Sequence, residues 1–576
     1  MKRMTKAGVA TIALTGAMTM LLAGCGASTG STSPANSTGN SNSSSSTPVN
    51  GGTLTIGQTT KWTDQFIPGM DSSLYTANVY SFAFDSILNF NNKLELTPWL
   101  VKSWSYSNGN KTITMHLHAH ANWSDGQPIT SQDVLLYMNF VGSKVYNTTF
   151  QGQYGYLVQP VKGSSELLSG KATSFTQTGG FKIINSKTFQ INLATADASA
   201  LAADLSGITP LPYHILGKIP FSQWKSNAYN TLPQVVSGAY IPTKADKSGS
   251  LVEFKANKNY WKGAPHISNI DIKYVSQNTE ASLVESGQLG FALNGLTPTD
   301  YLALEKASGV TTKTLPALGF EYLGLHENAA PWNNATLRQA VMYGIDHNAI
   351  INNIEKGLAS KIVGPIPSVS WAYTNQGMKQ YNYSVSKAKS LIKSQGYTMG
   401  SNGYYQKNGQ TLGFTITIGQ GSQTSQEVAD LIAQDMKQVG VKVTVNTPIA
   451  FTTLITDLEN NSKSIQGWIA GWSLGTDPDP RGLWGSTDAF NFERWVNKQD
   501  DTLIKNTWSL PSDFTQAGRK AAFVPWEQLV NHQVPLIFLY QNNNNYAYTN
   551  KLNIPANDWT AAGELPLNPQ QWWLSK

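Results

Sequence analysis

Cysteine is almost absent from this 576-residue chain, because Cys25 is the only one. A single thiol cannot close an intramolecular disulfide or build a cysteine zinc site, which excludes both classes of protein. Charged side chains are also scarce, at 13% of the residues against about 25% in an average protein. Beyond the first residues no run of Lys or Arg occurs, so the concentrated basic patch of a nucleic-acid-binding protein is missing.

Few charges also mean few paired carboxylates to lose in acid, and from this we hypothesise an acidic habitat. A stability profile that collapses below about pH 5 would contradict the hypothesis.

Long apolar runs are missing as well. Residues 1–24 begin with three basic residues and continue with an apolar stretch to Leu22, which is shorter than the roughly 20 residues of a membrane-spanning helix. The segment ends in the letters LAGC at Cys25. This pattern resembles a bacterial lipobox, which implies that residues 1–24 are a lipoprotein signal peptide and that Cys25 is lipidated.

Residues 26–50 are almost entirely Ser, Thr, Asn, Gly, Ala and Pro. A segment with so few apolar side chains cannot build a core. We therefore predict a flexible tether over residues 25–51, which would hold the protein on the outer face of the bacterial cell membrane through the acylated cysteine.

From Gly52 onwards the patterns are those of a mixed α/β protein. Alternating apolar residues predict strands at 53–56 and 111–118, and residues 181–193 predict a hairpin with its turn near Asn185. A capping-box pattern predicts a helix that begins at Thr130.

A strand–helix–strand unit is predicted further along the chain. Alternating apolar residues over 412–418 and 441–445 flank a helical apolar face over 428–439, and Gly440 stands where a helix C-cap favours glycine. Two more helices are predicted at 335–345 and 349–356. No second linker occurs, so we expect lobes built from interleaved segments.

Six segments, in order, resemble one family. They are Trp99–Trp104, Trp123–Val134, Val236–Tyr240 with Asn257–Gly263, Leu337–His347, Gly471–Pro480 and Pro535–Tyr540. The chain is identified on these segments as a member of the extracytoplasmic solute-binding proteins of family 5, the oligopeptide and dipeptide receptors of ABC importers. Two departures are Ala239, where proline is usual, and Gly344, where alanine is common.

The resemblance implies a periplasmic-binding-protein-like α/β fold of class II, with two hinged mixed-sheet lobes and an extra lobe. The predicted boundaries are 52–90, 190–300 and 540–576 for lobe I, 91–189 for the extra lobe II, and 301–539 for lobe III.

The resemblance also implies a peptide-binding cleft between lobes. A peptide's ammonium group needs a carboxylate, and its backbone needs exposed strand groups. The expected ligand-binding residues are Gln58, Gly471, Trp472, Ser473, Asp477, Asp479 and Trp484. Many members carry an aspartate soon after the tryptophan, but here the nearest one is displaced to Asp477.

Other residues of these six segments are expected to be structural. Trp99, Trp104, Trp123, Tyr260 and Trp261 are predicted to pack in the cores or between lobes, and Arg338 to form a structural ion pair.

The implied function is a lipid-anchored receptor that delivers oligopeptides to an ABC permease and its ATPases. We expect a monomer that is no enzyme and uses no cofactor or metal. Dipeptides, oligosaccharides and nickel chelates are the alternative ligands within the family, and a sensor or chaperone on the same fold is a further alternative.

Two patterns suggest other chemistry. Gly471–Gly475 fits the G-x-S-x-G elbow of serine hydrolases, with Ser473 as nucleophile and His532 as the only later histidine. The elbow requires a helix directly after the serine, and Pro478 and Pro480 oppose one. His116, His118 and His120 alternate on a predicted strand, but no carboxylate or thiol beside them completes a zinc site.

Overall fold

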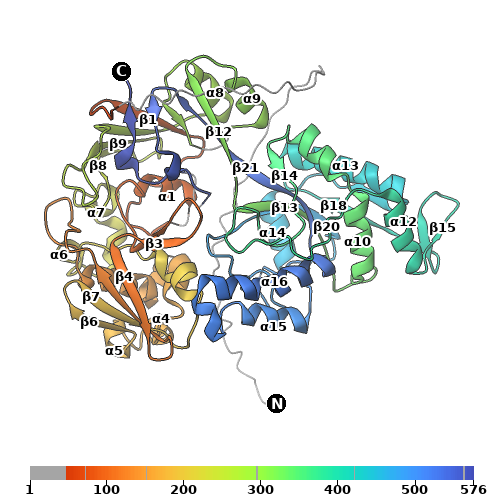
Figure 1. Cartoon of the computed structure of the whole chain (residues 1–576), viewed down its shortest axis with the longest axis horizontal. Coiled ribbons are helices and arrows are strands. Elements are labelled where there is room, and N and C mark those ends of the chain that lie inside the picture. Colours follow the sequence, from red (N-terminus) through yellow and green to blue (C-terminus); the bar gives the residue numbers. More distant parts are fainter. Residues whose placement is uncertain are drawn as a thin grey trace.

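The computed structural model describes residues 47–576, apart from residues 72, 151, 294, 295, 421, 489 and 562–564. The expected signal peptide, Cys25 and nearly all of the tether lie outside the described residues. Two large bodies lie side by side, and strand β21 (Ile537–Thr549) runs from one to the other (Figure 1). Within the described part, every helix is too short or too polar to cross a membrane.

The first body is built around strand β1 (Thr53–Gln58). Its alternating apolar residues are buried, and it pairs in parallel with β10 (Asn269–Tyr274) and β11 (Phe291–Ala292). The sheet continues through antiparallel β9 (Leu251–Ala256) and β8 (Tyr240–Ala245). Helices beside this sheet are α1 (Leu74–Tyr80), α7 (Ala228–Thr231), α8 (Gln277–Glu285) and α9 (Pro298–Leu304).

A separate antiparallel sheet in the first body has the order β4-β5-β7-β6. Its strands are β4 (Val101–Ser107), β5 (Thr112–Leu117), β7 (Thr188–Asn192) and β6 (Phe181–Asn185). They confirm the strand predicted at 111–118 and the hairpin predicted at 181–193. Smaller elements of this region are β2 (Leu88–Phe90), β3 (Leu96–Pro98), α3 (Lys144–Thr149), η1 (Gln153–Val158), α4 (Ser164–Ser169), α5 (Phe175–Thr178), η2 (Ala200–Asp204), η3 (Leu205–Gly207), α6 (Tyr213–Leu216) and η4 (Phe221–Ser226).

Helix α2 (Ser131–Gly142) begins where its capping box predicts. The Thr130 backbone N–H donates to the Asp133 carboxylate at 2.6 Å, and the Thr130 hydroxyl lies 2.9 Å from the same oxygen. These bonds satisfy groups at the helix start that have no partner inside the helix.

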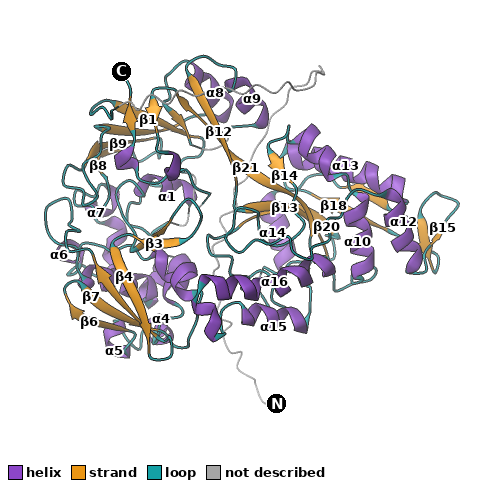
Figure 2. Cartoon of the chain, in the orientation of Figure 1, coloured by secondary structure: helices purple, strands orange, loops and turns teal. Residues whose placement is uncertain are grey.

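The second body holds the predicted strand–helix–strand unit. Strand β18 (Gly413–Thr417), helix α13 (Gln423–Val439) and strand β19 (Lys442–Val445) follow one another, and the two strands pair in parallel. Gly440 ends the helix with a left-handed φ of 92°, as predicted. Around this unit lie β13 (Gly319–Leu325), α12 (Val385–Ser394), α14 (Phe451–Glu459), β20 (Gly467–Ser473), α15 (Lys498–Asn506), η6 (Pro511–Phe514) and α16 (Gln516–Gln533) (Figure 2). Strand β12 (Val310–Pro316) lies outside this unit, near α8 and α9, and pairs with the second half of β21.

The two helices predicted before this unit have different outcomes. Helix α10 (Ala335–Gly344) forms as expected. The segment predicted as a helix at 349–356 is helical as far as Ile354, but only its start belongs to an α-helix, α11 (His347–Ala349), and the rest is a single π-turn, η5 (Ile350–Ile354). The spacing of its isoleucines is compatible with an α-helical turn and with a π-turn, so the sequence alone could not distinguish the two conformations.

One sheet path joins the two bodies, in the order β19-β18-β20-β13-β21-β11-β1-β10-β9-β8. The first half of β21 pairs with β13, and its second half pairs with β11 and β12. The remaining short strands are β14 (Ala359–Ser360), β15 (Thr398–Met399), β16 (Tyr405–Lys407), β17 (Gln410–Thr411), β22 (Leu552–Asn553) and β23 (Trp573–Leu574).

The apolar cores follow the two bodies. The largest core of the first body takes its buried side chains from residues 54–293 and again from residues 546–572, whereas the core of the second body lies within residues 320–540. The core of the first body is therefore completed by chain that is distant in sequence, whereas the core of the second body comes from one continuous stretch. The exact boundaries predicted for three lobes stay a prediction.

The residues expected to be structural are confirmed as such. The four predicted tryptophans and Tyr260 belong to the first core or pack against it. Arg338 is almost fully buried and pairs with Glu327 at 2.8 Å.

Candidate functional site

The candidate site begins where strand β20 ends. Strand β20 pairs with β13 along its whole length, but the parallel strand β18 pairs only with Gly467 and Trp468. In the part of the chain that the structure describes, no strand pairs with residues 469–473 on that side. The last residues of β20 therefore present a free strand edge.

Aromatic rings and a glycine shape this end of the strand. The Trp472 ring stacks against Tyr322 at 6.4 Å between centroids and against Phe492 at 5.9 Å. Gly471 lies beneath the Glu321 carboxyl group, and a Cβ atom at this glycine would come within 2.2 Å of Glu321 Oε1. Burial raises the pKa of Glu321 to about 7.

A cavity of about 120 Å³ opens beside the end of β20. It brings together five of the seven predicted ligand-binding residues, namely Trp472, Ser473, Asp477, Asp479 and Trp484. The rest of its lining is Pro365, Ile366, Leu474, Gly475, Pro478, Arg481, Gly482, Leu483, Phe490 and Trp526.

The other two predicted residues lie outside this lining. Gly471 is one residue before the wall formed by Trp472. Gln58, at the end of β1, is fully buried, and its amide donates to the Thr60 carbonyl at 3.0 Å and to the Tyr75 carbonyl at 3.3 Å. The Gln58 side chain is therefore part of the packing of the first body, and its role in ligand binding stays a prediction.

Both predicted ammonium acceptors are already paired with arginines. Asp477 accepts from Arg519 through both carboxylate oxygens, at 2.9 Å from Nη2. Burial raises the pKa of Asp477, and Arg519 offsets only part of that effect. Asp479 accepts from Arg481 Nε at 2.9 and 3.0 Å; burial would raise its pKa, but the guanidinium outweighs burial and lowers it.

Arg481 also connects the two bodies. Its Nη1 donates to Asp197 at 2.8 Å, its Nη2 donates to Ser199, and its guanidinium lies 4.7 Å from the Trp508 ring centroid. We call the contacts of Arg481 with Asp197 and Ser199 the Arg481 bridge.

Two further contacts join the bodies beside the Arg481 bridge. The Ala198 N–H donates to the Trp508 carbonyl at 2.9 Å, and the rings of Tyr106 and Phe514 meet at 5.3 Å. The bodies therefore touch at this bridge as well as along β21.

Sequence reasoning missed Arg481, Arg519 and Asp197. Arg481 follows the predicted Asp-Pro-Asp-Pro segment directly, so its position was a usable signal. The other two residues gave none, because Arg519 lies 42 positions from Asp477 and Asp197 lies 284 positions from Arg481.

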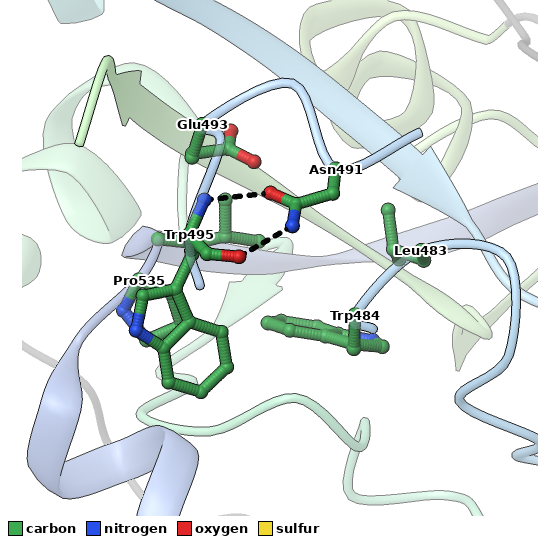
Figure 3. A pocket seen from close by; sticks show the side chains of 7 residues that line it. Leu483, Trp484, Asn491, Glu493, Trp495 and Pro535 are labelled. Atoms are coloured by element: carbon green, nitrogen blue, oxygen red, sulfur yellow. Dashed lines mark hydrogen bonds between the residues drawn. The ribbon is translucent and has the colours of Figure 1, made fainter. Parts of the chain in front are cut away.

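Leu483 and Trp484 line both this cavity and a second one of about 10 Å³, which is about the space of one water molecule. Asn491 holds this smaller cavity in shape by accepting from the Trp495 N–H at 2.9 Å and donating to the Trp495 carbonyl at 2.6 Å (Figure 3). Glu493 faces the same space, and burial raises its pKa to about 8. The Trp484 ring packs on Trp526 at 5.7 Å, so it is a rigid wall.

The geometry opposes the serine-hydrolase alternative. Ser473 is exposed at the end of β20, and the chain then continues without a helix until α15 begins at Lys498, apart from undescribed residue 489. The elbow needs the serine at a strand-to-helix turn. Among the described residues, no hydrogen bond joins Ser473 and His532.

The alternating histidines are engaged separately. His116 Nδ1 lies 3.2 Å from the Thr188 hydroxyl, and the His118 ring lies 5.0 Å from the Trp261 ring. Over the described ranges, no group of three His, Cys, Asp or Glu side chains is arranged to hold a metal ion.

Comparison with known proteins gives a consistent set of relatives. The family of bacterial extracellular solute-binding proteins, family 5 (middle region), matches residues 95–494. The oligopeptide-binding protein AppA of Bacillus subtilis (strain 168) is 23% identical over 540 residues, which cover 92% of this chain and 93% of the relative. The nickel-binding periplasmic protein of Escherichia coli (strain K12) is 24% identical over 395 residues, or 67% of this chain and 70% of the relative.

A solved structure of Bacillus subtilis AppA, in complex with a nonapeptide, has a TM-score of 0.68 at 21% identity and covers 92% of this chain and 100% of that one. At this identity the likeness concerns the fold, and it confirms the α/β class of a periplasmic peptide-binding protein.

Proposed function

We propose a function from a premise that the matched residues establish: the chain belongs to the bacterial extracellular solute-binding proteins of family 5. We infer that it is an oligopeptide receptor that holds its ligand between the two bodies. In this proposal the protein binds and releases peptide and performs no chemistry.

One observation carries the proposal: the free edge of β20 lies beside a cavity with aromatic and charged walls. Peptides of different sequence share a backbone and charged termini, so a receptor for many peptides must recognise those. The free backbone groups of residues 469–473 can pair with an extended peptide as an added strand. Trp472 and Trp484 supply apolar walls for its side chains.

Delivery completes the proposed role. The peptide-loaded receptor would dock on an ABC permease with its ATPases, at the outer face of the membrane, held by lipidated Cys25 and the tether. A labelled-lipid incorporation assay on the full chain and on Cys25→Ser tests the anchor. Incorporation into the variant would contradict it.

Native mass spectrometry of residues 50–576, freshly purified from cells, tests the ligand. Bound masses that fragment as peptides would support the proposal and give the peptide length. A single saccharide or a nickel chelate would keep the family and change the ligand. An empty protein that shows no thermal shift with mixed peptides would refute peptide binding and favour a sensor or an enzyme.

A further inference from the structure

The cavity beside the end of β20 has mostly apolar walls that are packed in place. Three tryptophans of its lining, Trp472, Trp484 and Trp526, are 7%, 5% and 1% exposed. The Trp484 ring meets Trp526 at 5.7 Å between centroids, and the Trp472 ring meets Phe490 at the same distance. Ile366 adds an aliphatic side chain that is 2% exposed. The cavity is therefore preformed, and it cannot widen unless several packed rings move.

The two aspartates in the wall are already engaged with arginines. Both carboxylate oxygens of Asp477 accept from Arg519, and both of Asp479 accept from Arg481. An ammonium group that entered the cavity would lose its water and would have to compete with a guanidinium for the same oxygens. An entering carboxylate would lose its water and meet two acids. The cavity therefore disfavours charged groups of either sign and favours apolar ones.

The volume of the cavity limits the apolar groups that fit. Its roughly 120 Å³ is less than the roughly 150 Å³ of an engineered protein cavity that binds benzene. The branched aliphatic side chain of a leucine, isoleucine or valine fits this space, whereas the ring of a phenylalanine or tryptophan is too large. The methyl group of an alanine would leave most of the space unfilled, and the walls would lack partner atoms.

The strand geometry explains how a peptide side chain could reach the cavity. Ala470 and Trp472 lie on one face of β20, and Gly471 and Ser473 lie on the other, because successive residues of a strand alternate. A peptide paired with the free edge at residues 469–473 would place every second side chain on the face of Trp472. The side chain level with Trp472 would then lie beside the cavity, which has room for one such group.

We propose that this cavity is a selective subsite, which takes one branched aliphatic side chain of the bound peptide. This inference rests on the proposed function and deepens it, because it names the class of peptide that the receptor prefers. The peptide backbone would provide affinity for peptides in general, and the cavity would select those with leucine, isoleucine or valine at one position. The three carbon atoms by which leucine exceeds alanine correspond to about 10- to 100-fold in affinity.

The test compares hexapeptides of alanine and serine that carry one guest residue, which is moved through every position. Relative affinities for the full chain are measured by competition in native mass spectrometry. At one position, we expect leucine or isoleucine to bind at least tenfold more tightly than alanine. Phenylalanine, tryptophan, lysine and glutamate at that position should bind no better than alanine. At the other positions the guests should differ by less than about threefold.

A variant with a wider cavity tests the location of the subsite. Ile366→Ala removes part of the wall, and we expect phenylalanine at the selective position to gain at least threefold relative to leucine. Ile392→Ala is the matched control, because Ile392 is 1% exposed in the same core and lies outside the lining of the cavity. It should keep the wild-type preference. Melting temperatures verify that each variant is folded.

The contrary outcomes separate the inference from the proposed function. If the wild-type protein binds the peptides but shows no selective position, or accepts tryptophan or lysine there as well as leucine, the inference is wrong and peptide binding stands. This result does not depend on either variant folding. If folded Ile366→Ala keeps the same preference as Ile392→Ala, the selective subsite is not this cavity and the inference is again overturned. If no peptide of the set binds, the proposed function itself is refuted.

Discussion

Arg519 and Asp477 form a buried ion pair at the base of the candidate site. Their side chains are 6% and 2% exposed, and Arg519 Nε also donates to the Thr507 carbonyl at 3.0 Å. Two charges removed from water are tolerated when each satisfies the other, but a single remaining charge is not. The pair therefore stabilises the site mainly by holding the loop after β20 against helix α16.

Replacing Arg519 with Ala leaves Asp477 buried without its partner. We expect the free energy of unfolding to fall by about 3–5 kcal/mol, measured by urea denaturation. Lys520→Ala, one position along and exposed, is the control and should change it by less than about 0.5 kcal/mol. Equal effects of the two substitutions would show that the pair has no special importance.

Strands β13 and β20 make room for an acid in the middle of a sheet. Glu321 and Gly471 are register partners, and the glycine leaves the space that the carboxyl group occupies. We expect Gly471→Ala to destabilise the protein by about 1–3 kcal/mol, because its methyl group would displace Glu321. In a Glu321→Ala background the same change should cost much less, and a double-mutant cycle by chemical denaturation measures this coupling. Additive effects would mean that Glu321 does not fill the space.

Single elements could be predicted where their pattern is local. The strand at 412–418, the helix at 428–439 and the cap at Gly440 follow from the spacing of nearby side chains. The π-turn η5 could not be predicted, because its isoleucines satisfy two kinds of turn. In the site, Trp472 and Ser473 were found through their motif, whereas the partners of the aspartates depend on distant segments meeting in space.

The two bodies also meet through the Arg481 bridge, whose residues lie well before β21 in the sequence. Because the Arg481 side chain is 35% exposed, the bridge is partly screened by water. We expect Arg481→Ala to weaken peptide binding about 2- to 10-fold, mainly through faster release, because contacts between the bodies would be lost. Stopped-flow fluorescence measures the release rate. Lys498→Ala, at an exposed position on α15, is the control; if Arg481→Ala released peptide no faster than this control, the bridge would have no part in retention.

The whole molecule should be more stable in mild acid than in alkali. Burial raises the pKa of Asp500 and Glu493 to about 8 and that of Glu527 to about 9. The folded protein holds these protons more tightly than the unfolded chain, so their stabilising effect is complete below about pH 4 and is lost as the pH rises toward 9. Asp479, whose pKa is lowered by Arg481, works in the opposite direction.

We therefore expect the melting temperature to be higher at pH 5 than at pH 9, measured by differential scanning calorimetry. Glu527→Gln removes one of the titrating groups and should flatten this dependence. A melting temperature that rises with pH over this range would contradict the assignment, and would also remove support for the hypothesis of an acidic habitat.

Residues 546–572 complete the core of the first body, and this determines when that body can fold during synthesis of the chain. A chain that emerges from a ribosome or an export channel with its N-terminus first exposes β1 long before the second half of β21 follows. Until then β11 has no β21 to pair with, and the core lacks Tyr546, Trp559 and Trp572. This body therefore cannot mature as an early, independent unit during translation. Its folding cannot be completed until the whole of the second body has emerged. The incompletely folded intermediate meanwhile exposes apolar surface that a chaperone would have to cover.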